Sequence, residues 1–84
     1  MTVRLRFFAS LRERLKASAA ERTLSDGATV ADLWAVLCRE RPDLETLSRS
    51  ITFAVNREYV EREHVLADGD EVALIPPVSG GSQW

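Results

Sequence analysis

The chain has 84 residues, 45% of them hydrophobic, and a formal net charge of −2. A chain of this size builds one modest core, which excludes two lobes around a deep catalytic cleft. Acids and bases are interspersed, so no basic run indicates a nucleic-acid partner, and no apolar stretch approaches the ~20 residues that cross a membrane. The single cysteine, Cys38, forms no internal disulfide, and the first residues lack a signal-peptide layout. We therefore expect a soluble cytoplasmic protein.

The first third of the chain predicts a strand, a short helix and a second strand. Residues 3–7 alternate apolar and charged side chains, as in a strand with one buried face. Ser10 is a candidate cap for a short helix that runs through Lys16. Residues 21–24 form the candidate second strand.

A longer helix is predicted at residues 30–41. Thr29 is placed to cap it, with Asp32 three residues later as in a capping box. One apolar stripe follows helical spacing: Val30, Leu33, Trp34, Leu37 and Cys38. Pro42 ends the helix, and residues 43–50 are expected to form a loop or a short helical turn.

Three further strands are predicted in the second half, at residues 51–55, 58–60 and 71–75. Tight turns at Asn56-Arg57 and at residues 68–70 connect them. The order of elements favours an α+β domain in which two helices pack on one face of a mixed sheet of about five strands.

After the last strand the composition changes. Pro76 and Pro77 lack backbone N–H groups, so they stop the sheet and stiffen the path of the chain. Ser79 is small, and Gly80 and Gly81 have no Cβ, so another protein can approach this backbone closely. Such a segment is suited to entering the active site of another protein, and Val78 is the one larger side chain that would fix its register.

Three segments resemble a known family. They are FFASLRE at residues 7–13, VNREYV at residues 55–60, and residues 66–81, which contain the two prolines and end in Gly-Gly. These segments resemble the ubiquitin-like, or β-grasp, sulfur carriers, a family that includes the small subunit of molybdopterin synthase and the thiamine-pathway carrier.

The resemblance implies a β-grasp domain at residues 1–77 and a flexible tail at residues 78–84. It implies that the carboxylate of Gly81 is adenylated by a ubiquitin-activating-type enzyme that uses ATP, and then becomes a thiocarboxylate. The tail would deliver this sulfur to a pterin precursor inside the large subunit of molybdopterin synthase. The chain would bind no metal or cofactor of its own, and would be a carrier subunit rather than an enzyme alone.

The chain departs from the family at its end, because Ser82, Gln83 and Trp84 follow Gly81. One interpretation is a precursor that a zinc metallopeptidase trims to expose Gly81. A second is a binding module that is never activated. Sulfur routes to cysteine, thiamine or other metabolites, and a role as a ubiquitin-like protein modifier, also remain open.

Strand parity predicts a surface for partners. If residues 3, 5 and 7 face the core, Phe8 faces away from it, and Ile75 faces away by the same argument on the last strand. Phe8, Tyr59 and Ile75 are therefore expected to form an exposed apolar patch, continued by Pro76 and Pro77. The alternative is that Phe8 and Ile75 are core residues at strand ends.

The other chemistry-bearing residues are predicted to be structural. We expect Cys38 and Trp34 in the core, and His64, Glu61 and Glu63 in a solvated loop without a metal. Four arginines form a mild basic cluster, either a solvated face or a set of steering charges for an acidic partner: Arg4, Arg6, Arg12 and Arg14.

Overall fold

The computed structural model describes residues 1–77. The elements follow in the predicted order, with a short 3₁₀ helix, η1, before the third strand. They are β1 (Thr2–Phe7), α1 (Ala9–Leu15), β2 (Ala19–Thr23), α2 (Val30–Glu40), η1 (Pro42–Leu47), β3 (Thr52–Val55), β4 (Glu58–Val60) and β5 (Glu71–Ile75). No helix within residues 1–77 has the length and apolar character that a membrane span requires.

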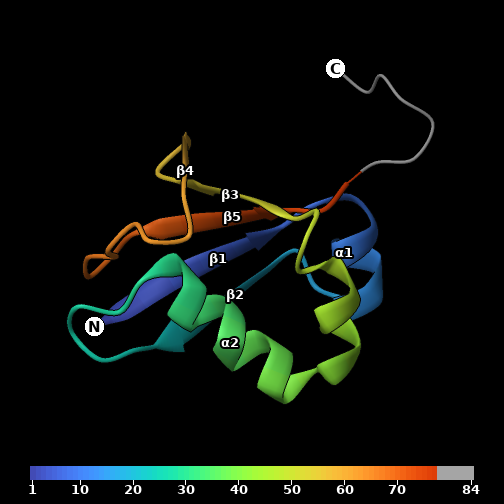
Figure 1. The fold of residues 1–84 in the computed structure, drawn as a ribbon, viewed down its shortest axis with the longest axis horizontal. Coiled ribbons are helices and arrows are strands. Elements are labelled where there is room, and N and C mark those ends of the chain that lie inside the picture. The colour runs from blue at the N-terminus through green and yellow to red at the C-terminus, as the bar shows by residue number, and fades with distance from the viewer. Residues whose placement is uncertain (78–84) are drawn as a thin grey trace.

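The five strands form one mixed sheet in the order β2-β1-β5-β3-β4. The central strands β1 and β5 are parallel, and the other neighbours are antiparallel. Both helices lie on one face of this sheet, as Figure 1 shows, so the α+β prediction is confirmed. The opposite face is not covered by a helix, and we call it the open face.

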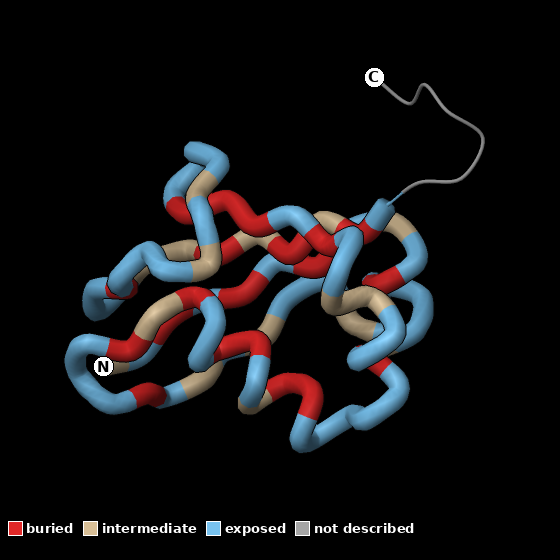
Figure 2. Tube along the Cα trace, in the orientation of Figure 1, coloured by how far each residue is buried: buried red, intermediate tan, exposed pale blue. Residues whose placement is uncertain are grey.

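Burial alternates along the central strands, as expected for a sheet covered on one side (Figure 2). Val3 and Leu5 of β1, and Val72 and Leu74 of β5, have no exposed surface. These side chains join the apolar stripe of α2 and Leu11 of α1 in one core cluster. The predicted inward residues and the predicted helix stripe are therefore confirmed.

The start of α2 follows the predicted capping box. The Asp32 amide donates to the Thr29 hydroxyl at 3.2 Å, and the Thr29 amide donates to the Asp32 carboxylate at 2.9 Å. The next free amide, that of Val30, donates to the carbonyl of His64 at 3.0 Å. The helix N-terminus is thereby joined to the loop after β4.

The predicted cap of α1 is wrong. The helix begins at Ala9, one residue before Ser10, and its N-cap is Phe8, which makes no side-chain cap hydrogen bond. The Phe8 carbonyl instead accepts from the amides of Leu11 and Arg12, at 3.1 and 3.4 Å. Because β1 and Leu11 share one core, the chain must reverse within a few residues, and Ala9 does so with a φ of 52°.

The second strand also differs from its prediction. It begins at Ala19, two residues earlier than predicted, because its register with β1 pairs Ala19 with Arg6 and Thr23 with Thr2. Small alanines carry little strand preference of their own, so pairing with β1 decides where this strand starts.

A polar and aromatic cluster braces the centre of the fold. Trp34 is buried, its indole N–H donates to the Ser48 hydroxyl at 2.8 Å, and its ring meets Phe53 edge-on at 5.8 Å. The Arg62 guanidinium lies over the same Phe53 ring and donates to the Ser48 carbonyl. These contacts join α2, the segment after η1, β3 and the loop after β4, so Trp34 is a core residue as predicted.

Candidate docking face and chain exit

The described chain leaves the sheet from its middle. Ile75 is the last residue of β5 and pairs with Thr52 of β3. Pro76 and Pro77 have no N–H to continue the ladder, so the strand ends there, as predicted. The exit point is firmly held, because β5 lies between β1 and β3 and its inward side chains are fully buried (Figure 1).

One row of residues crosses the open face on all five strands. The register places Ala19, Arg6, Ala73, Ala54 and Tyr59 opposite one another, from β2 to β4. Ala54 is only 6% exposed and lies outside the core cluster, Ala73 is half-buried and Ala19 is exposed. The centre of the face is thus floored by alanines, which allow a partner's backbone or side chains to approach closely.

Larger side chains stand around this alanine floor. Phe8 is 39% exposed and Tyr59 70%, the two large hydrophobic residues on this face that the structure leaves most open. Ile75 is half-buried and Pro77 is exposed. Pro76 is buried, so little of its ring is available to a partner, contrary to its predicted place in the patch.

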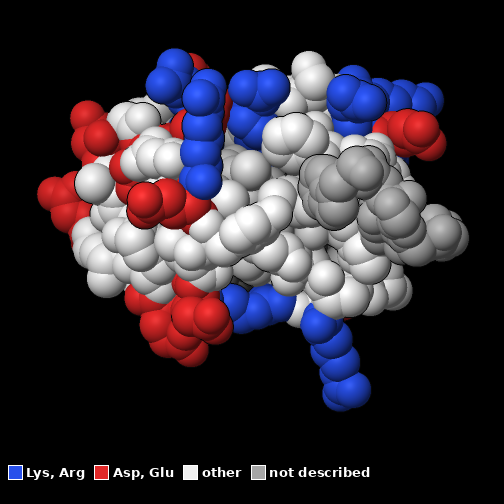
Figure 3. Space-filling view, turned by 90° about the horizontal axis from the view of Figure 1, so that it is seen from above, with Lys and Arg blue, Asp and Glu red and all other residues white. Residues whose placement is uncertain are grey.

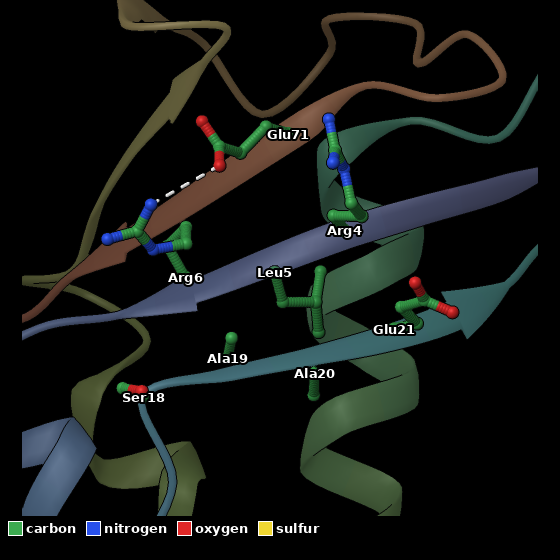
Figure 4. A pocket seen from close by; sticks show the side chains of 8 residues that line it. All are labelled: Arg4, Leu5, Arg6, Ser18, Ala19, Ala20, Glu21 and Glu71. Atoms are coloured by element: carbon green, nitrogen blue, oxygen red, sulfur yellow. Dashed lines mark hydrogen bonds and ion pairs between the residues drawn. The ribbon is translucent and has the colours of Figure 1, made fainter.

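Charged side chains border the same face. Arg6 lies 3.4 Å from Glu71 and 5.9 Å from the centre of the Phe8 ring. Figure 4 shows Arg6 turned toward Glu71, beside a shallow hollow between β1 and β2 that Arg4 and Glu21 also line. Both side chains of the Arg6–Glu71 pair are solvent-accessible, so this ion pair contributes little to the stability of the fold.

The described residues contain no activated nucleophile. Cys38 is buried, and burial is the main cause that raises the pKa of its thiol. The nearby Glu45 carboxylate raises that pKa further, while a Ser48 hydrogen bond and the Arg62 charge oppose the rise. The thiol therefore stays protonated, as a small apolar side chain.

The predicted solvated loop is also observed. His64, Glu61 and Glu63 are all exposed. Within residues 1–77 no group of three or more His, Cys, Asp or Glu side chains is arranged to hold a metal ion. What the described part of the chain offers is a docking face beside a strand end.

Four predicted site residues, Val78, Ser79, Gly80 and Gly81, lie outside the described residues. Other features were not anticipated from the sequence. Asn56 is hydrogen-bonded to Asp70 and Glu71, and Arg22 to Glu40. These partners are too far apart in the sequence for a local pattern to indicate them.

Comparison with known proteins gives a consistent family. The model of the ThiS family matches residues 5–81. A molybdopterin synthase sulfur carrier subunit of Chlamydomonas reinhardtii is 40% identical over 83 residues, covering 96% of this chain and all of that protein. A subunit of the same description in Escherichia coli is 37% identical over 81 residues, covering 94% of this chain and 99% of that protein.

Solved structures agree with these relatives. Small archaeal modifier protein 1 of Haloferax volcanii has a TM-score of 0.78 at 29% identity, covering 92% of this chain and 98% of that one. A complex of subunits 1 and 2 of the molybdopterin-converting factor of Helicobacter pylori has a chain with a TM-score of 0.68 at 28% identity, covering 96% of this chain and 100% of that one. A ubiquitin of Caldiarchaeum subterraneum, 18% identical with a TM-score of 0.64 over 96% of this chain and 98% of that one, shows the shared β-grasp fold.

Proposed function

Because this chain belongs to the ThiS family, we propose that it is the sulfur carrier subunit of a molybdopterin synthase. The relatives of that description match it over nearly their whole length. One observation carries the proposal: the family match extends through residue 81 and so includes the Gly80-Gly81 pair that the chemistry requires.

The proposed chemistry takes place at the Gly81 carboxyl group. A carboxylate is a poor electrophile, because its negative charge is shared by both oxygens. An activating enzyme would use ATP to form an acyl-adenylate: a carboxylate oxygen attacks the α-phosphorus and pyrophosphate leaves. Hydrosulfide (HS⁻) supplied by a partner would then attack the carbonyl carbon, AMP would leave, and loss of the thiol proton would give a thiocarboxylate.

This chain would contribute reach and fit rather than catalysis. The body would dock through the open face, with Phe8, Tyr59 and Ile75 around the alanine floor. The segment from Pro76 to Gly81 spans at most ~20 Å when extended, enough to enter an active site while the body stays outside. We propose two partners, an adenylating enzyme and the large synthase subunit. A complex of two subunits in the Helicobacter pylori factor supports the second.

Activation would require a free Gly81 carboxylate. In the sequence three residues, Ser82, Gln83 and Trp84, follow it, so its carbonyl carbon is held in a peptide bond. We therefore propose that a peptidase removes these residues first.

A reconstitution with purified proteins tests this function. A chain ending at Gly81 and the chain ending at Trp84 are each incubated with ATP and the adenylating enzyme of the same organism, and pyrophosphate release is measured. We expect release with the chain that ends at Gly81 and none with the longer one. Equal release from both, or none from either, would contradict the proposal.

A second candidate function is attachment to other proteins, and the likeness to small archaeal modifier protein 1 favours it. Both functions begin with the adenylate, so pyrophosphate release does not separate them. They differ in what becomes bonded to Gly81: sulfur in a carrier, the amine of a lysine side chain in a modifier.

A further inference from the structure

The turn between β3 and β4 is built in an unusual way. Its two residues, Asn56 and Arg57, have φ values of 51° and 73°. Positive φ at both positions is characteristic of a type I′ turn, in which glycine is the preferred second residue. In two other tight turns of residues 1–77, glycine occupies the left-handed position, at Gly27 and Gly69. Arg57 is thus held in a left-handed backbone conformation that is sterically unfavourable for a residue with a Cβ atom.

Asn56 holds this turn against the start of β5. The Asn56 amide N–H donates to the Glu71 carbonyl at 2.8 Å, and the Glu71 amide donates to Asn56 Oδ1 at 3.1 Å. Asn56 Nδ2 donates to Asp70 Oδ1 at 2.9 Å. The backbone of Arg57 is consequently fixed relative to the central strand of the sheet.

Within the described residues, the Arg57 side chain makes no contact that accounts for an arginine at this position. Arg57 is exposed, and within residues 1–77 its guanidinium forms no ion pair or hydrogen bond, unlike those of Arg6 and Arg22. It lies two residues from Tyr59, the more exposed of the two large side chains on the open face. A residue with a strained backbone and no stabilising side-chain contact of its own is a candidate for a functional role.

We propose that Arg57 is a contact residue for a partner, binding a carboxylate on the large synthase subunit as that subunit covers the open face. A guanidinium is suited to this role because it binds a carboxylate through two parallel hydrogen bonds. Figure 3 shows the molecule from above, with basic side chains along one margin and others at the opposite margin, and acidic side chains mainly to one side. This inference rests on the proposed function, because it takes its partner from that function.

Three variants test the proposal against a purely structural role. Arg57→Gly removes the charge and relieves the turn, Arg57→Lys keeps the charge without the two-pronged geometry, and Arg39→Gln removes one exposed charge on α2, which lies on the covered side of the sheet. The dissociation constant for the large subunit of the same organism is measured at low and high salt, together with the melting temperature of each variant.

We expect Arg57→Gly to melt at the wild-type temperature or above, yet to bind at least about fivefold more weakly at low salt, with a smaller salt dependence. Arg57→Lys should bind with intermediate strength, and Arg39→Gln like the wild type. Wild-type binding by Arg57→Gly would overturn the inference and leave the proposed function intact, whereas failure of the wild type to bind would overturn both. A clear fall in the melting temperature of Arg57→Gly would also overturn it, because Arg57 would then be structural.

Discussion

Arg22 on the outer strand β2 holds Glu40 at the end of α2 through two hydrogen bonds, from Nε at 3.0 Å and from Nη2 at 2.6 Å. Its third nitrogen, Nη1, donates to the Glu21 carbonyl at 2.6 Å. That carbonyl points away from the sheet, because the residues that bond to β1 are the even-numbered ones, Ser18 and Leu24 among them. An unpaired strand edge is a template for another chain, so Arg22 occupies an acceptor that a second copy would use.

Removing the Arg22 side chain should let the free edge of β2 pair with a second copy of the chain. We expect Arg22→Ala to remain folded but to form dimers whose fraction rises with concentration, measured by light scattering after size exclusion. Arg41→Ala is the matched control, because it removes an exposed arginine that pairs with Asp43 away from any strand edge. A monomeric Arg22→Ala at every concentration would show that Arg22 does not guard the edge.

The open face can be blocked without disturbing the core. Ala73 lies at the centre of the alanine floor, and its side chain points away from the helices. We expect Ala73→Arg to keep the wild-type melting temperature within a few degrees and to lose most of its binding to the large subunit. Ala35→Arg carries the same change on the exposed side of α2 and should keep both properties. Normal binding by Ala73→Arg would place the docking surface elsewhere.

The side chain of Asn56 joins the β3–β4 turn to the start of β5 through hydrogen bonds to Asp70 and Glu71. Both hydrogen bonds are solvent-exposed, so water can replace the lost partners. We expect Asn56→Ala to lower the free energy of unfolding by about 0.5–1.5 kcal/mol. Urea denaturation measures it, and an unchanged midpoint and slope would contradict this account of the turn.

Cys38 makes stability depend on alkaline pH. Its thiol pKa is raised in the folded state, so as pH rises the unfolded chain loses this proton first. The contribution is complete below the ordinary thiol value of 9.0 and declines as pH rises past it. We expect the wild type to lose stability above that pH faster than Cys38→Ala does. Parallel pH profiles for the two proteins would contradict the assignment.

The same variant tests whether the thiol takes part in sulfur transfer. Since Cys38 is buried and protonated, Cys38→Ala should still accept sulfur at Gly81, although it loses ~1 kcal/mol of stability from the space that the sulfur atom leaves. Loss of sulfur loading in a folded Cys38→Ala protein would show that the thiol relays the sulfur.

Local periodicity predicted most of the fold. The stripe of α2 and the alternation in β1 and β5 each repeat often enough to define one buried face, and the Thr29–Asp32 capping box fixes where α2 begins. The start of α1 was missed because no side chain caps it. There the backbone turns at Ala9 in a left-handed conformation that alanine rarely adopts.

The candidate site was only partly predictable. Parity placed Phe8 and Ile75 on the open face, but it did not reveal that Pro76 is buried. The contacts of Arg22 with Glu40, and of Asn56 with Asp70, depend on tertiary packing that brings distant segments together, so no sequence spacing indicates them.

The central claim is that Gly81 becomes a sulfur donor, and the intact mass of the protein recovered from its own host tests this most directly. The account predicts a chain that has lost Ser82, Gln83 and Trp84 and has one oxygen replaced by sulfur. Recovery of only the full chain, or of Gly81 bonded to another protein, while the host is making molybdopterin would contradict it.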